Sequence, residues 1–230
     1  NKIKSQKVKI IFIDRPNKRK THELNIVRIG GLSLFSSIFL NIIFLNFLGF
    51  FENADLYSQN LLYIILFGSL SFFLLGIYDD IFKISPFKRL FIQFLISIFL
   101  WSIGLRIEIL KVPFIADSNS LIYLNNFLSV IISSIWIVGL VNSINWIDGL
   151  DGLATTICLI SSIGLAIIAL INNHVFLTIW IFCIIGGSLG FLFYNFKPAK
   201  IFLGDGGSYL LGFSIAAANI IEFYSYDSTY

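Results

Sequence analysis

Seven apolar stretches divide this chain of 230 residues, and each is about long enough to cross a lipid bilayer as a helix. A helix rises about 1.5 Å per residue, so a hydrocarbon core of about 30 Å needs about 20 mostly apolar residues. Charged residues make up only 13% of the chain, against about a quarter in soluble domains. The sequence therefore predicts an all-α fold, a polytopic membrane helix bundle of about seven transmembrane helices. The expected spans are roughly residues 29–51, 59–78, 87–107, 127–145, 152–171, 174–195 and 206–224.

The organisation along the chain is that of a single unit. No long internal repeat or low-complexity linker is visible, so residues 1–230 are expected to form one integral membrane domain. The chain starts at Asn1 and contains no Met, and its last apolar stretch ends near the C-terminus. We therefore expect the domain to be truncated at both ends. Cys158 and Cys183 lie in apolar stretches and are expected to be buried thiols, neither a disulfide nor metal ligands.

Basic residues lie almost entirely on one side of the predicted membrane. Nine precede the first span, three lie between the second and third spans, and two lie between the sixth and seventh. Only Arg106 and Lys111 fall on the other side. Because cytoplasmic loops are enriched in Lys and Arg, the basic side is predicted to be cytoplasmic. The segment 106–126 is then outside, as either a short hairpin or a surface helix.

Six aspartates gather at the same predicted face, and none of them lies in the middle of a span. A proton or ion pathway would place acids nearer the bilayer midplane, which counts against a transporter or lipid flippase. Acids at one face suit a site that takes a water-soluble, phosphate-bearing substrate from the cytosol. The positions are Asp14, Asp79, Asp80, Asp148, Asp151 and Asp205.

The stretch "NSINWIDGLDGLA" (142–154) repeats a polar side chain every third residue: Asn142, Asn145, Asp148 and Asp151. One aspartate could simply cap the following helix, but capping does not explain two Asn and two Asp in register. On a regular helix this spacing drifts by about 60° per step and forms a slanting stripe. The glycine after each aspartate favours a broken, closely packed backbone. We interpret the stretch as part of a binding site.

Two other motifs carry aspartates. In "GIYDD" (76–80), neighbouring helical carboxylates point about 100° apart, so Asp79 and Asp80 are expected to have different roles, such as holding a metal and taking a proton. The alternative without a functional role is that the two aspartates form salt bridges with nearby Lys or Arg side chains. "FLGDGGS" (202–208) places Asp205 among glycines at a predicted helix start, where free N–H groups favour anions. This motif lacks the Lys-Ser/Thr ending of a P-loop. The alternative interpretation is a glycine-rich turn in which Asp205 caps the helix.

Together with "DRPNKRKTH" (14–22) and "RIGG" (28–31), these motifs resemble the polyprenyl-phosphate N-acetylhexosamine-1-phosphate transferases, which form glycosyltransferase family 4. The family includes bacterial enzymes that begin O-antigen and teichoic acid synthesis, and phospho-N-acetylmuramoyl-pentapeptide transferase. The basic start is more similar to the undecaprenyl-phosphate GlcNAc-1-phosphate branch.

The chain also departs from the family pattern. Asn25 and Val27 stand where the family has prolines, and Arg89 stands at a usual lysine. The family has about ten or eleven spans and a His-rich loop near its C-terminus, whereas this chain has only His22 and His174, the latter predicted outside. An inactive fragment of such a transferase is therefore an alternative.

The resemblance implies transfer of an N-acetylhexosamine-1-phosphate, with GlcNAc the expected sugar, from its UDP derivative to polyprenyl (undecaprenyl) phosphate, releasing UMP. This is the first membrane step of cell-envelope glycan synthesis, at the cytoplasmic face of the bacterial plasma membrane. Mg²⁺ is the expected cofactor, with Mn²⁺ as the alternative. Membrane lipid is an expected partner, whereas nucleic acid is not. A CDP-alcohol phosphotransferase fits less well, because "DGLDGLA" lacks the arginine of that signature.

The resemblance also implies residue roles. Asp79 or Asp80 would orient or deprotonate the lipid phosphate, although an aspartyl-phosphate intermediate stays open. Asp205 with Asn145 or Asp148 would hold the metal, and Asn142 would support them. Asp151 and Phe202 would hold the uracil, with plain interfacial packing the alternative for Phe202. The diphosphate would be bound by Lys88, Arg89, Arg28 and His22. The sugar, the downstream glycan and the number of chains, a homodimer included, stay open.

Overall fold

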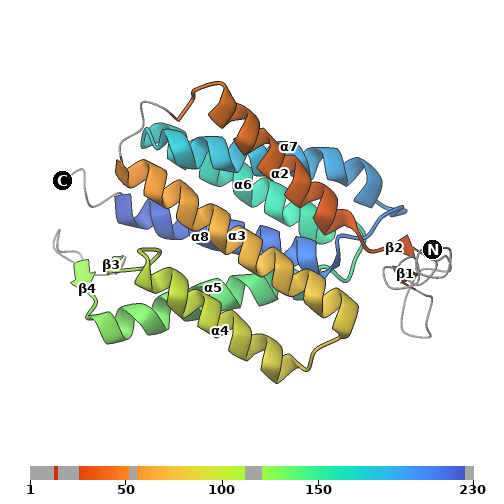
Figure 1. Ribbon diagram of the computed structural model, residues 1–230, viewed down its shortest axis with the longest axis horizontal. Coiled ribbons are helices and arrows are strands. Elements are labelled where there is room, and N and C mark those ends of the chain that lie inside the picture. Colours follow the sequence, from red (N-terminus) through yellow and green to blue (C-terminus); the bar gives the residue numbers. More distant parts are fainter. Residues whose placement is uncertain (1–12, 15–25, 52–55, 112–120, 226–230) are drawn as a thin grey trace.

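The computed structural model describes residues 13–14, 26–51, 56–111 and 121–225. Its helices run side by side as a bundle (Figure 1). They are α2 (Gly30–Phe47), α3 (Leu56–Phe82), α4 (Pro86–Ser102), α5 (Asn126–Ile147), α6 (Leu153–Ile171), α7 (Val175–Asn195) and α8 (Gly204–Ser225). Each predicted span corresponds to one of these helices, so the prediction of an all-α bundle is confirmed.

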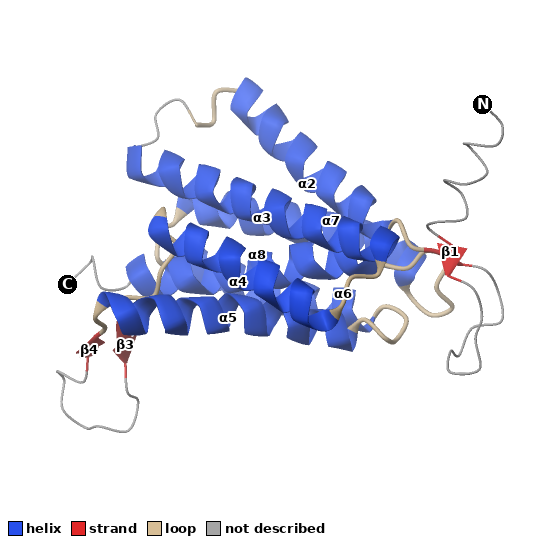
Figure 2. Ribbon diagram, turned by 60° about the horizontal axis from the view of Figure 1, so that its bottom comes forward, coloured by secondary structure: helices blue, strands red, loops and turns tan. Residues whose placement is uncertain are grey.

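Two small antiparallel strand pairs flank the bundle. β1 (Ile13–Asp14) pairs with β2 (Ile26–Val27) at one end, and β3 (Ile109–Lys111) pairs with β4 (Leu121–Tyr123) at the other (Figure 2). The second pair shows that the segment 106–126 contains a hairpin, which was one of the two alternatives left open by the sequence. The backbone of Ile107, just before β3, is held by the Ser129 and Ser133 hydroxyls of α5.

Within the described residues, five helices are long and apolar enough to cross a membrane: α2, α3 from Gln59, α5, α6 and α7. α4 has only 17 residues. α8 has 22 residues but is rich in Gly, Ser and Ala. The count of about seven spans therefore matches the number of helices, whereas only five of them also have the length and hydropathy of a span.

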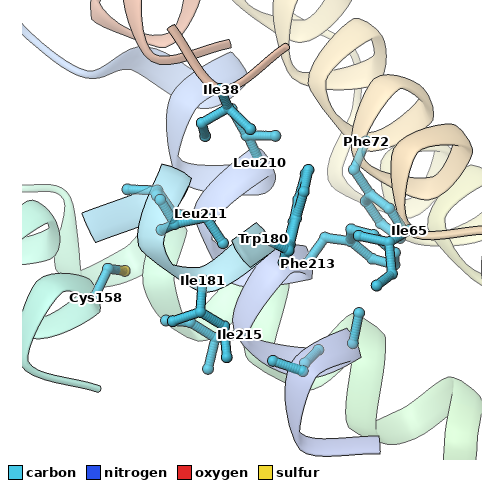
Figure 3. Close-up of a cluster of buried hydrophobic side chains, with 14 of the residues drawn as sticks. Ile38, Ile65, Phe72, Cys158, Trp180, Ile181, Leu210, Leu211, Phe213 and Ile215 are labelled. Atoms are coloured by element: carbon cyan, nitrogen blue, oxygen red, sulfur yellow. The ribbon is translucent and has the colours of Figure 1, made fainter. Parts of the chain in front are cut away.

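α8 is the central helix of the bundle. It packs against α2, α3, α5 and α6, and every residue from Gly206 to Ala218 is buried. Figure 3 shows Phe213 of α8 beside Phe72 of α3, with Trp180 of α7 nearby, and the rings of Phe72 and Phe213 stack with centroids 5.1 Å apart. Because α8 faces protein rather than lipid, its low hydropathy carries no cost, and its small residues let neighbouring backbones approach.

Both cysteines are free, as expected, with Cys158 buried and Cys183 half-buried. Successive helices run in opposite directions (Figure 1). As a result, the predicted site positions within the described residues lie at one end of the bundle, where α8 begins and where α3 and α5 end. His174 lies at the opposite end, between α6 and α7, which agrees with its predicted placement away from the site.

Gly212 provides a test of this close packing. A Cβ atom at Gly212 would lie 2.7 Å from Cα of Val141, so Gly212→Ala must push α5 away from α8. We expect a loss of about 1–3 kcal/mol, measured as a lower thermal unfolding temperature in detergent. Gly139→Ala on α5, where an added Cβ meets nothing within 4 Å, is the control. It should be neutral or stabilising, because Ala favours helix over Gly by about 1 kcal/mol. Equal effects of the two substitutions would contradict this packing.

Candidate active site

The site begins where the chain enters α2 and α8. The backbone leading into α2 runs parallel to the backbone leading into α8, with Phe202 N donating to Val27 O at 2.9 Å and Gly30 N to Phe202 O at 3.0 Å. Gly31 N donates to Leu203 O at 2.8 Å. The "RIGG" and "FLGDGGS" motifs, which are far apart in sequence, are therefore hydrogen-bonded to each other.

Glycines bring α3 and α2 against the first turn of α8. A Cβ atom at Gly76 of α3 would overlap the carbonyl group of Asp205, and one at Gly31 of α2 would overlap the backbone nitrogen of Gly207. Only glycine permits such a close backbone approach. As a result, the two aspartates at the end of α3 reach the start of α8.

Asp79 is buried, with 4% of its surface exposed, and links three parts of the chain. Its Oδ1 accepts a bond from Ile84 N at 3.1 Å, just beyond the end of α3. Its Oδ2 accepts from Arg89 Nη1 of α4 and from Tyr209 Oη of α8, both at 3.2 Å. Charge-assisted bonds of this kind are strong and directional, so Asp79 joins α3, α4 and α8.

Asp80 has a different environment, as the 100° rotation between neighbouring residues predicts. Its Oδ2 accepts a bond from Gly206 N at 3.2 Å, which is one of the free N–H groups at the start of α8. Its Oδ1 is buried and accepts no hydrogen bond, and it lies 3.8 Å from Nη1 of Arg28. One carboxylate oxygen of Asp80 therefore has no hydrogen bond among the described residues and faces the guanidinium of Arg28.

Asn145 and Asp205 come together from α5 and α8. Asn145 Nδ2 donates to Asp205 Oδ1 at 2.9 Å and to Ser208 Oγ at 3.0 Å. These bonds place two of the three predicted metal ligands in direct contact.

Asp148 follows the last residue of α5 and belongs to the same electrostatic cluster. Burial raises the pKa of its carboxyl group to about 8, against the opposing effect of Arg28, and the carboxylates of Asp205 and Asp80 raise this pKa further. Burial is thus the main cause of the raised pKa, and the crowding of the neighbouring carboxylates adds to it. A bound cation would relieve this crowding.

The remaining predicted site residues lie around this cluster. Asp151 Oδ2 accepts a bond from Ala199 N at 3.0 Å, which ties the stretch after α5 to the loop before α8. Phe202 in that loop is half-buried. Arg89 is bonded to Asp79, whereas the neighbouring Lys88 is exposed to solvent.

One predicted residue in the described part of the chain stands apart from the cluster. Asn142 lies one turn before Asn145 on α5 and is buried against Gln93 of α4, to which it donates a bond at 2.6 Å. His22 lies outside the described residues, so its predicted role stays a prediction.

Three buried side chains of the site were not predicted from the sequence. Tyr209 is fully buried and bonds Asp79, and Ser208 bonds Asn145. Asn195 at the end of α7 accepts from Thr155 Oγ1 at 2.9 Å and donates to Ile201 O at 3.0 Å, which supports the loop before α8. A serine and a tyrosine directly after "GDGG" are visible in the sequence, but nothing local identifies their partners.

The cluster offers oxygen donors for a divalent cation. Asp80, Asp148, Asp205 and Asn145 carry carboxylate or amide oxygens, and Asp80 has a buried oxygen without a hydrogen bond. Among the described residues, no three His, Cys, Asp or Glu side chains form a preassembled metal site. Mg²⁺ fits such a set, because it commonly binds one or two carboxylates, several waters and substrate phosphates rather than an all-protein cage.

The two aspartates of "GIYDD" should differ in their effect on stability. Asp79→Asn removes the charge that Arg89 and Tyr209 bond, so we expect a loss of about 3 kcal/mol. Asp80→Asn keeps an acceptor for Gly206 N and removes a charge close to Asp205, so stability should change by less than about 1 kcal/mol. Thermal unfolding of both variants in detergent measures the difference. A similar loss in both would show that Asp79 has no special structural role.

Five helices of membrane-spanning length and hydropathy, with an acidic cluster at one end of the bundle, define a polytopic membrane protein. A family model described as "Glycosyl transferase family 4" matches residues 62–222. The chain belongs to this family, and it is an integral membrane protein. The resemblance inferred from the sequence motifs is thereby confirmed.

Individual relatives agree with this assignment. The chain is 35% identical over 222 residues to a probable undecaprenyl-phosphate N-acetylglucosaminyl 1-phosphate transferase of Bacillus subtilis (strain 168), covering 96% of this chain and 58% of the relative. It is 33% identical over 212 residues to an undecaprenyl-phosphate alpha-N-acetylglucosaminyl 1-phosphate transferase of Thermotoga maritima, covering 92% of this chain and 57% of the relative. A phospho-N-acetylmuramoyl-pentapeptide-transferase of Listeria innocua is 44% identical over 114 residues, which cover 50% of this chain and 34% of that protein. The chain thus spans little more than half the length of the first two relatives.

Proposed function

We propose that the protein containing this chain transfers N-acetylglucosamine-1-phosphate from UDP-GlcNAc to undecaprenyl phosphate and releases UMP. The observation that carries the proposal is the convergence of the "RIGG", "GIYDD", "NSINWIDGLDGLA" and "FLGDGGS" motifs at one end of the bundle. A site at the membrane surface suits this pair of substrates, because the nucleotide sugar is water-soluble and the acceptor is a lipid. The excess of Lys and Arg in the segments that the sequence predicts on this side of the membrane supports a cytoplasmic site.

Phosphoryl transfer mainly requires positioning and neutralisation of charge. Asp80 is the better placed of the two α3 aspartates to orient or deprotonate the acceptor phosphate, because Asp79 is occupied by Arg89, Tyr209 and Ile84. Arg28 lies beside Asp80 and is 30% exposed, so its guanidinium can bind phosphate oxygens.

Asn145, Asp148 and Asp205 would hold Mg²⁺, or Mn²⁺ in its place. A bound cation would neutralise charge on the diphosphate and fix its orientation. Asp151 is bonded to Ala199 of the loop before α8, and Phe202 lies in the same loop, so the two remain the candidates for holding the uracil. Lys88 remains a candidate for the diphosphate from an exposed position at the start of α4.

Asp80→Asn tests the division of roles between the two aspartates. In the complete protein, reconstituted with undecaprenyl phosphate and UDP-GlcNAc, we expect UMP release to fall by at least about 10³-fold while the fold is retained. Asp79→Asn should lower activity together with the unfolding temperature. Full UMP release by Asp80→Asn would remove Asp80 from the mechanism.

Removal of divalent cations tests the metal proposal. Chelation should abolish UMP release and added Mg²⁺ should restore it. Asp205→Asn is expected to raise the Mg²⁺ concentration needed for half-maximal rate by at least about tenfold. Glu222→Gln makes the same chemical change at the far end of α8 and should leave that concentration unchanged. A normal Mg²⁺ dependence in Asp205→Asn would contradict its assignment as a ligand.

A further inference from the structure

A buried pair of amides joins α4 to α5 behind the site. Gln93 has 0% and Asn142 5% of its surface exposed. Asn142 Nδ2 donates to Gln93 Oε1 at 2.6 Å and to Val138 O at 2.7 Å. Gln93 Nε2 and Asn142 Oδ1 are buried without a hydrogen-bond partner. Unpaired buried polar groups reduce stability, and two apolar side chains would pack here without that cost, so the pair requires another explanation.

The position of the pair suggests that explanation. Gln93 lies one helical turn after Arg89 on α4, and Asn142 lies one turn before Asn145 on α5. Arg89 holds Asp79, and Asn145 holds Asp205. The amide pair therefore connects the two helices directly beneath the side chains that each contributes to the site (Figure 2 shows α4 and α5 side by side).

Apolar contacts alone would not define this arrangement well. Between helices in a bilayer, apolar side chains gain similar energy in several rotations and heights, whereas a directional hydrogen bond favours one. Buried polar residues in coiled coils likewise specify register at a cost in stability.

We propose that Gln93 and Asn142 are positioning residues that set the rotation and height of α4 relative to α5, and thereby the placement of Arg89 and Asp79 relative to Asn145 and Asp205. This inference rests on the proposed function. It also gives Asn142 a role that differs from substrate binding, because its amide group faces Gln93 of α4 and acts through Asn145, one turn further along α5.

Activity measurements on the complete protein test the proposal. Gln93→Leu and Asn142→Leu should each lower kcat for UMP release by about 10- to 100-fold, because misplacement by about 1 Å has effects of this size. KM for UDP-GlcNAc should change by less than about threefold. Each single variant leaves a buried amide with an unpaired group and should lower the unfolding temperature, whereas the double Leu variant should recover or exceed the wild-type value. The double Leu variant should be no worse than either single variant, since both remove the same interaction.

An exchange of the two side chains is the rescue experiment. Gln93→Asn alone leaves the pair one methylene too short and should lower kcat. Gln93→Asn combined with Asn142→Gln keeps a donor, an acceptor and the combined length, so kcat should return to within about threefold of wild type. Ser97→Ala removes a buried hydroxyl one turn away on α4, bonded to Gln93 O at 2.8 Å, and should leave kcat unchanged.

A distance measurement separates this inference from the proposed function. Spin labels at Lys88→Cys and Trp146→Cys, two exposed positions at the site end of α4 and α5, report the α4–α5 arrangement in a background without Cys158 and Cys183. The distance distribution should be narrow in wild type, broader or shifted in the Leu variants, and narrow again after the exchange. This result is independent of any substrate.

Two outcomes would overturn the proposal. If Asn142→Leu lowers kcat but Gln93→Leu does not, Asn142 contacts the substrate itself. If the spin-label distances are the same in wild type and both Leu variants, the pair does not set the helix arrangement. An absence of UMP release in the wild-type protein would instead count against the proposed function, with the distance measurement still deciding the role of the pair.

Discussion

The site depends on the glycine contacts at the first turn of α8. Gly76 of α3 and Gly31 of α2 leave no room for a side chain between their helices and the backbone of residues 205–207. This close approach places Gly206 N within hydrogen-bond distance of Asp80 and Tyr209 Oη within reach of Asp79. If these backbones were separated by the width of a methyl group, both bonds would be lost, so packing and chemistry are coupled through a few small residues.

The central position of α8 explains its unusual composition. A helix that faces lipid must be apolar on its outer surface, whereas one surrounded by other helices can carry Gly, Ser and Ala. α8 is buried along nearly its whole length, and its N-terminal turn carries Asp205, Ser208 and Tyr209 of the site. The same burial that shields α8 from lipid holds these side chains in one arrangement.

The sequence was sufficient for the helices, for the end of the bundle that carries the acids and for the family, because apolar length and short motifs are local signals. It also predicted that Asp79 and Asp80 differ, from helix geometry alone. It did not predict that Arg89 rather than Lys88 pairs with Asp79, or that Tyr209 does so from 130 residues away. Such partners depend on how helices pack, and neither charge nor spacing along one helix determines them.

The surroundings of the acidic cluster offset part of its charge. Bringing Asp80, Asp148 and Asp205 together at low solvation is unfavourable, as the raised pKa of Asp148 shows. The N-terminal N–H groups of α8 and the guanidinium of Arg28 oppose that cost at Asp80, and the Asn145 amide opposes it at Asp205. These groups bond only some of the carboxylate oxygens, and one oxygen of Asp80 keeps no hydrogen bond. Amides at these positions would avoid that cost, so stability alone does not explain the acids, whereas the proposed binding of a cation together with a phosphorylated substrate does.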